Sequence, residues 1–163
     1  MAVFDSSPLI LLANIGILDK VLEHLKEKAV ITEKVFMEIT AKETFDSKLL
    51  MGRVEEGRIE RKAIKDKSLF ARIIKDFNCD EGEAESIVLC LETNTGIVTD
   101  DKKAMKVSKL FNISRTTAAN LLIRLYNRKA ITGEEAEAYI VKLKKFGRYS
   151  DAIIEKVREE MKK

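Results

Sequence analysis

Hydrophobic and polar residues follow two patterns along this chain, one typical of short buried strands and one typical of amphipathic helices. The strand-like segments are Ala2–Asp5, Ala29–Thr32, Arg58–Ile64, Gly96–Thr99 and Asn112–Ser114. Helical spacing is found at Pro8–Gly16, Ile17–Lys28, a segment starting at Glu33, Ser68–Phe77, Gly82–Glu92, Lys102–Phe111 and Thr117–Lys129. Residues 43–58 predict a short helix and a turn at Gly52 or Gly57. This alternation of strands and helices is the signature of an α/β fold with a parallel sheet.

Capping residues mark several of the expected helix starts. Ser7 is a good N-cap because Pro8 follows it at the first helical position. Thr132 and Glu135 have the spacing of a capping box, as do Asp80 and Glu83. Further caps are expected at Thr32 and Ser150. The last two helices lie within residues 130–163, which we interpret as a C-terminal helical extension of a single domain spanning residues 1–163.

The composition excludes several kinds of protein. A chain of 163 residues suits one domain, and 45% apolar residues are ordinary for a globular fold. The only two cysteines, Cys79 and Cys90, form no CxxC motif, which argues against a disulfide scaffold and a structural zinc site. The single histidine, His24, lies in a stretch rich in Lys and Glu and is expected on a helix surface. Any chemistry must therefore depend on carboxylates, lysines or a metal.

The N-terminal segment lacks the basic stretch and long apolar run of a signal peptide. The longest uninterrupted apolar run, Leu9–Ala13, is far shorter than the ~20 residues of a membrane span. We therefore expect a cytoplasmic protein that makes no use of a membrane.

Acidic residues follow two of the predicted strands. Asp5 ends the first strand, and Asp100 with Asp101 ends the fourth. Because ligands of parallel α/β sheets bind at the carboxyl ends of strands, these acids are expected at one edge of the sheet. Glu38 and Glu85 lie beside the apolar stripes of their helices. Carboxylates gathered in one cleft repel each other and favour a cation, for which Mg²⁺ or Mn²⁺ is the natural choice. Such a site can activate water against a phosphodiester without a histidine.

All of these acids except Glu85 also have a structural alternative. Asp5 could cap the first helix, and either Asp100 or Asp101 could cap the helix that follows them. Glu83 has capping-box spacing to Asp80, so a purely structural role is the favoured interpretation for it. Glu38 alone would be an ordinary surface glutamate.

The chain resembles the PIN domain family, the fold of many VapC-type toxin ribonucleases. The motifs that carry this resemblance are Val3–Ser7, Val35–Ile39, Gly82–Ile87, Val98–Asp101 and the tail Phe146–Asp151. Gly82–Ile87 and the tail are similar to a GEAE-type subgroup of PIN-like proteins. Residues 130–163 extend past the compact core of the smallest PIN toxins, which weakens the case for an ordinary toxin role.

The resemblance implies a three-layer α/β/α sandwich with a mostly parallel central sheet. It also implies a divalent-metal-dependent endoribonuclease that cleaves single-stranded RNA. Members of the family are often homodimers, and many are toxins that pair with an antitoxin protein. The implied catalytic residues and metal ligands are Asp5, Glu38, Glu85 and Asp101, with Asp100 as a substitute for Asp101. Ser6, Ser7 and Thr99 would orient ligands or waters through their hydroxyls.

Charge is unevenly distributed along the chain. Residues 101–163 carry 16 Lys and Arg against 8 Asp and Glu, whereas residues 1–100 carry 14 against 19. A basic segment beside an acidic one is consistent with a phosphate-bearing partner, for which Lys102, Lys103 and Lys106 are the candidate contacts.

Two other functions compete with the nuclease. Ser114–Ala119, preceded by Lys102–Phe111, resembles the second helix of a helix-turn-helix, although such a motif has no use for the acids. A non-catalytic PIN-like scaffold would keep the fold without the chemistry.

Overall fold

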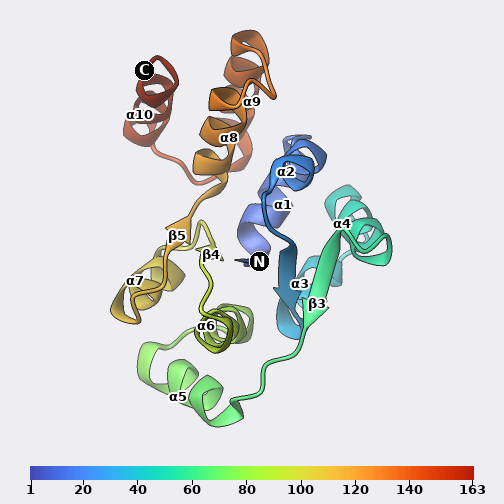
Figure 1. The fold of residues 1–163 in the computed structure, drawn as a ribbon, viewed down its shortest axis with the longest axis vertical. Helices are drawn as coiled ribbons and strands as arrows, with labels where there is room; N and C mark the ends of the chain where they lie inside the picture. The colour runs from blue at the N-terminus through green and yellow to red at the C-terminus, as the bar shows by residue number, and fades with distance from the viewer.

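A five-stranded sheet forms the centre of the computed structural model, which describes residues 1–163. Its strands are β1 (Ala2–Phe4), β2 (Ala29–Thr32), β3 (Ile59–Lys62), β4 (Ile97–Val98) and β5 (Arg115–Thr116). They are all parallel, in the order β3-β2-β1-β4-β5. From β1 the chain builds outward through β2 and β3, then returns to the other side of β1 for β4 and β5 (Figure 1). The strand order therefore reverses between β1 and β4, the place where α/β sheets form binding sites.

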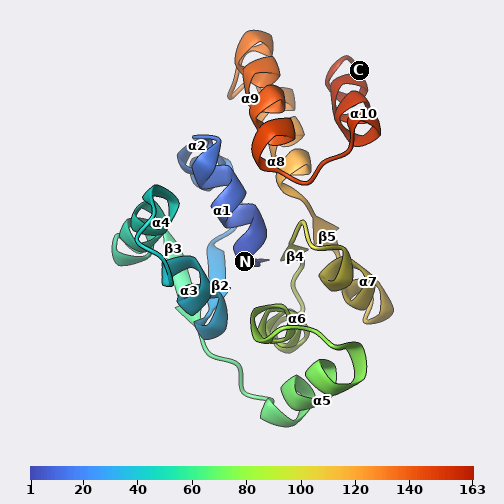
Figure 2. The same cartoon turned by 180° about the vertical axis from the view of Figure 1, so that it is seen from behind.

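Ten helices cover the two faces of this sheet (Figures 1 and 2). They are α1 (Ser6–Asn14), α2 (Leu18–His24), α3 (Glu33–Thr40), α4 (Phe45–Glu55), α5 (Lys67–Phe77), α6 (Glu81–Thr93), α7 (Lys102–Leu110), α8 (Ala118–Asn127), α9 (Gly133–Phe146) and α10 (Asp151–Met161). This arrangement confirms the predicted α/β sandwich.

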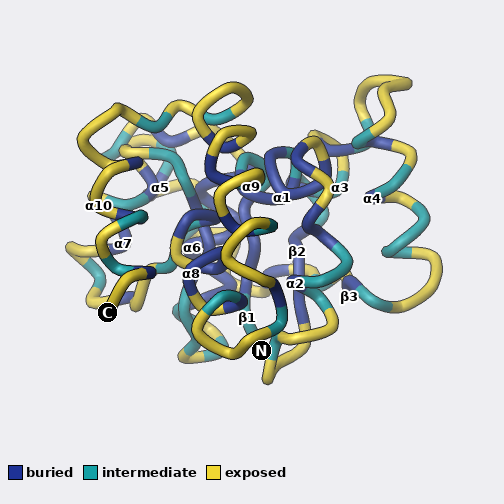
Figure 3. The backbone as a smooth tube through the Cα atoms, turned by 90° about the horizontal axis from the view of Figure 1, so that it is seen from above, coloured by how far each residue is buried: buried dark blue, intermediate teal, exposed yellow.

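Alternation along the strands separates the core into two clusters. Phe4, Ile31 and Val98 join a cluster of 29 buried residues beneath α1, α8 and their neighbours. Their chain neighbours on β1, β2 and β4 point to the opposite face and join a cluster of 13 residues with α5, α6 and α7. The buried residues run through the middle of the molecule along β1 and β2, whereas the outer turns of α4 and α10 are exposed (Figure 3).

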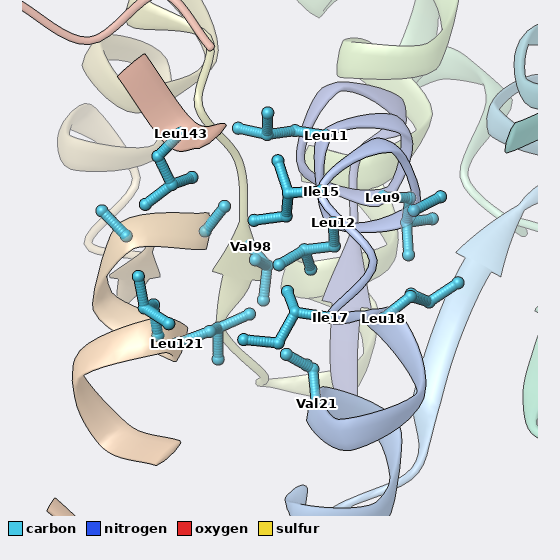
Figure 4. Packing of buried hydrophobic residues seen from close by; sticks show 14 of the residues in the cluster. Leu9, Leu11, Leu12, Ile15, Ile17, Leu18, Val21, Val98, Leu121 and Leu143 are labelled. Carbon is cyan, nitrogen blue, oxygen red and sulfur yellow. The ribbon is translucent and has the colours of Figure 1, made fainter. Parts of the chain in front are cut away.

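The C-terminal helices belong to the larger cluster. Leu143 of α9 faces Leu11 of α1 and Ile15, the residue that follows α1, and Leu121 of α8 lies toward Ile17 (Figure 4). Buried residues of α10, including Val157, complete the same layer. Residues 130–163 are therefore packed onto the α1–α8 layer of the core.

Most expected caps are confirmed, and one is wrong. Thr32, Thr132 and Ser150 cap α3, α9 and α10, and Asp80 caps α6 in a full capping box. The first helix, however, is capped by Asp5 and not by Ser7. It begins two residues earlier than expected because the Asp5 carboxylate accepts the first free amide, Ser6 N, at 2.8 Å.

Two predicted elements differ in position. Helix α2 ends at His24, four residues before the expected end, because Leu25 adopts an extended conformation. The last strand is Arg115–Thr116 instead of Asn112–Ser114, and it pairs with β4. A strand of the sheet therefore separates α7 from α8, so the helix-turn-helix interpretation of Ser114–Ala119 is wrong.

Of the three residues considered for their chemistry, Cys79 lies beside two acids, because burial and then the charges of Glu83 and Asp80 raise the pKa of its thiol. His24 is exposed and its Nδ1 lies 2.9 Å from the Lys20 carbonyl oxygen. Cys79 and Cys90 are buried free thiols. None of the ten helices has both the length and the apolar composition that crossing a membrane requires.

Candidate active site

Asp5 lies at the carboxyl end of the central strand and is only 3% exposed. Its Oδ1 accepts from Ser6 N at 2.8 Å, and its Oδ2 accepts from Thr99 Oγ1 at 2.9 Å. Thr99 follows β4, so this hydrogen bond joins the two strands where the strand order reverses. Burial raises the pKa of Asp5 to about 6, although both hydrogen bonds oppose the shift. The charges of Glu38 and Asp80 raise it further.

Glu38 reaches the same region from α3. Its carboxylate lies against the backbone of Gly82, where an added Cβ would come within 2.2 Å of Oε1. Glycine at this position therefore lets α3 and α6 approach each other with the carboxylate between them. Desolvation raises the pKa of Glu38, the Ser6 hydroxyl and the Gly82 amide lower it, and Asp80 raises it again.

Glu83 and Asp101 form the third part of the cluster. Glu83 is 7% exposed and belongs to the capping box of α6, where Asp80 N donates to Oε2 at 3.1 Å. Asp101 caps α7, because its Oδ1 accepts from Lys103 N at 2.7 Å and Ala104 N at 2.9 Å. Burial, the charge of Asp80 and a hydrogen bond to Asp101 raise the pKa of Glu83. Burial opposes ionisation of Asp101, but hydrogen bonds from Ala104 and Glu83 hold its pKa below the usual value.

Glu83 was missed as a candidate because capping-box spacing already explained its presence in the sequence. The structure shows that one side chain serves both purposes, since Glu83 caps α6 and also contacts Asp101. Burial distinguishes Glu83 from an ordinary capping glutamate, which is usually exposed, because Glu83 lies within a fully buried stretch of α6. This burial is visible only in the folded chain.

Glu85 does not join these acids. Its Oε2 accepts from Lys34 N at 2.9 Å, at the first turn of α3, and its Oε1 lies 3.9 Å from Lys67 Nζ. Glu83 and Glu85 are two positions apart, which turns their side chains about 200° from each other around the helix axis. The structure therefore places Glu85 on the α3 side of α6 and Glu83 on the α7 side. The expectation that Glu85 lies with Asp5 and Asp101 is wrong in this geometry.

Asp100 also points elsewhere. Its Oδ1 accepts from Ala118 N at 3.1 Å and from the Tyr149 hydroxyl, and its Oδ2 is buried without a partner. Burial raises the pKa of Asp100, and the bonds from Tyr149 and Ala118 partly oppose this. Asp100 thus joins the end of β4 to α8 and to the C-terminal segment. Of the two adjacent aspartates, Asp101 is the one that the structure brings to Glu83.

The three expected orienting hydroxyls have different surroundings. Thr99 contacts Asp5 and also accepts from Asp101 N at 3.1 Å, so it links two of the acids. Ser6 lowers the pKa of Glu38 through its hydroxyl. The Ser7 hydroxyl is buried without a hydrogen-bond partner.

The acidic cluster consists of Asp5, Glu38, Asp80, Glu83 and Asp101, and Lys103 is near enough for its charge to lower the pKa of Asp101. None of its members forms an ion pair with Lys or Arg. Glu83 and Asp101 share a hydrogen bond, but no three Asp, Glu, His or Cys side chains converge closely enough to hold a metal ion. Like charges in one cleft repel each other. An all-oxygen donor set that lacks cations fits Mg²⁺ or Mn²⁺ in its chemistry.

We expect the Tyr149→Phe variant to be less stable. The change removes the hydroxyl that donates to the buried Asp100 carboxylate, which should lower the free energy of unfolding by about 2 kcal/mol. Urea denaturation measures this loss. Tyr139→Phe is the matched control on α9, and it should change stability by less than about 0.5 kcal/mol. Equal stability of the two variants would show that the Asp100–Tyr149 contact contributes nothing.

Comparison with known proteins gives one match. A family model described as a PIN domain matches residues 1–163, which include α9 and α10. No curated protein and no solved structure matches the chain. The match confirms the resemblance found in the sequence, whereas membership of the GEAE-type subgroup stays a prediction.

Proposed function

This chain belongs to the PIN domain family, and we propose that it is a divalent-metal-dependent endoribonuclease that hydrolyses single-stranded RNA. Members of the family are generally nucleases and typically use divalent metal ions. The observation that best supports the proposal is the acidic cluster itself. Five carboxylates without an ion-pair partner lie where the strand order reverses between β1 and β4.

Four carboxylates would hold the cation in this proposal: Asp5, Glu38, Glu83 and Asp101. A bound Mg²⁺ or Mn²⁺ would supply a water of lowered pKa and stabilise the charge that develops on the leaving oxygen. Asp5 is fixed in position by Ser6 and Thr99, so it presents its remaining lone pairs in one orientation. Glu38 and Glu83 are on separate helices, α3 and α6, and can be drawn toward Asp5 once their repulsion is neutralised.

The lysines at the start of α7 are the proposed phosphate contacts, and they are not equivalent. Lys103 Nζ donates to the Asn78 carbonyl at 2.7 Å, so this ammonium group is already engaged. Lys102 and Lys106 are exposed and form no ion pair. We therefore expect Lys102 and Lys106 to contribute more to RNA binding than Lys103.

The proposal is tested with a labelled single-stranded RNA. We expect cleavage in Mn²⁺ or Mg²⁺, no cleavage in excess EDTA, and recovery when metal is restored. A duplex RNA and a single-stranded DNA of the same sequence serve as comparison substrates. No cleavage of any RNA at saturating metal would favour the non-catalytic scaffold instead.

Its biological partners are also part of the proposal. We propose that the protein forms a homodimer and acts in the cytoplasm, with an antitoxin protein as partner if it is a toxin. Induced expression tests the toxin role, because growth should stop with the wild-type chain and continue with an Asp5→Asn chain.

A further inference from the structure

A groove of about 850 Å³ adjoins the acidic cluster. It lies between α1, α7, α8 and α10 and is bounded by the connection Phe146–Tyr149. Asp101, a member of the acidic cluster, lines this groove together with Lys102. Its volume is within the range of about 300–1,000 Å³ that is usual for ligand sites. Figure 1 shows α10 beside α8. Both α7 and α10 lie on the side of the molecule where β5 forms the edge of the sheet.

The groove has an apolar lining that includes exposed side chains. Phe146 is 53% exposed and Ile153 is 44% exposed, and both lie in the groove with Ile10 and Ile123. The Phe146 ring also has Lys145 Nζ at 5.2 Å from its centroid. An exposed aromatic ring beside a cation is the combination on which nucleobases stack in proteins that bind single strands.

Three cations line the groove without any carboxylate partner. Lys102, Arg148 and Lys156 are exposed, and none of them forms an ion pair. Of the acids in the lining, Asp100 is occupied by Tyr149 and Ala118, and Asp101 belongs to the acidic cluster. Glu160 is the remaining negative side chain. The lining thus holds three cations and three carboxylates, but only the cations are fully exposed.

The wall formed by Phe146–Tyr149 is held in place by close packing. Gly147 is required because an added Cβ would come within 2.7 Å of the Leu143 carbonyl oxygen and 2.8 Å of the Tyr149 ring. Tyr149 then returns to the end of β4, where its hydroxyl donates to Asp100. A wall anchored in this way has little ordering entropy to lose when a ligand binds.

We propose that this groove binds the stretch of single-stranded RNA next to the cleaved linkage. In this assignment bases pack against Phe146 and the neighbouring isoleucines, and phosphates contact Lys102, Arg148 and Lys156. The assignment rests on the proposed nuclease function, because a strand cut beside Asp101 has to pass through or along the groove that Asp101 lines. The unpaired cations favour a polyanion over a protein segment as the occupant.

The test measures binding separately from cleavage. Fluorescence anisotropy reports the affinity of a labelled single-stranded RNA for the uncleaving Asp5→Asn chain. The double variant Arg148→Gln, Lys156→Gln should bind the RNA about tenfold more weakly. The slope of log K against log salt concentration should become shallower by about 1.4, because two phosphate contacts are lost. Lys48→Gln with Lys75→Gln is the control of equal charge, since both residues are exposed on α4 and α5. Phe146→Ala should weaken binding without changing the salt dependence.

Equal affinities for the groove and control variants would overturn the assignment and leave the groove to a protein partner. Cleavage is measured in parallel with the same groove and control variants made in a chain that keeps Asp5. If the wild-type chain cuts RNA and the groove variants bind and cut like the control, the groove assignment fails and the nuclease stands. If RNA binding depends on the groove but no chain cuts, the nuclease fails instead.

Discussion

Replacing Asp5 with asparagine is expected to lower the rate of RNA cleavage by about a thousandfold, because charge stabilisation by a metal ion is worth several kcal/mol. Asp5 is the most buried member of the acidic cluster and the one fixed by hydrogen bonds from two elements. Single-turnover cleavage of a labelled RNA at saturating Mn²⁺ measures the effect. Asp76→Asn, an exposed aspartate on α5, is the control and should cleave at the wild-type rate.

The same variant should be more stable without metal. Burial raises the pKa of Asp5 from 3.8 to about 6, so between these values the folded chain keeps a proton that the unfolded chain releases. The contribution of Asp5 to the free energy of unfolding therefore falls as pH rises from about 4 to about 6 and stays low above that. Asp5→Asn removes the destabilising effect of the buried ionised carboxylate but weakens the hydrogen bond from Thr99. The free energy of unfolding should therefore rise by about 1–2 kcal/mol at pH 7.5.

Urea denaturation in EDTA at pH 4.5 and pH 7.5 checks this. The stability difference between variant and wild type should be larger at pH 7.5. A difference independent of pH would mean that the Asp5 carboxyl titrates normally, and its place in an unneutralised acidic cluster would be contradicted.

The second large effect separates two glutamates of one helix. Glu83→Gln should lower cleavage by about a hundredfold or more, because Glu83 lies with Asp101 and Asp80. Glu85→Gln should retain cleavage within about threefold and lower the free energy of unfolding by about 1 kcal/mol, since α3 loses a charged acceptor at its first turn. Each variant is the matched control for the other, as both remove one charge from α6. Loss of cleavage in Glu85→Gln with retention in Glu83→Gln would reverse the assignment of these two residues.

Local signals predicted much of the fold. Thr32 followed by a helical pattern placed the boundary between β2 and α3 correctly, and Thr132 with Glu135 placed the start of α9. These succeed because a cap is satisfied within three residues of itself. The strand Arg115–Thr116 was misplaced because two residues give no periodicity, and only pairing with β4 defines it.

The candidate site was harder to predict because it depends on which way each acid points. Asp100 and Asp101 are adjacent, and only the packing of Tyr149 and Ala118 against one of them distinguishes their roles. Glu83 and Glu85 differ in the same way, through α7 on one side of α6 and α3 on the other. Sequence spacing shows that the two members of such a pair point in different directions. Which of them enters the site depends on the neighbouring helix or strand.

The most direct test of the central claim is the anomalous diffraction of crystals soaked in Mn²⁺. The account predicts a manganese peak bounded by carboxylate oxygens of Asp5 and Asp101, with Glu38 or Glu83 completing the set at about 2.0–2.2 Å. Absence of any peak there at saturating Mn²⁺, or a peak that has Glu85 among its ligands, would contradict it.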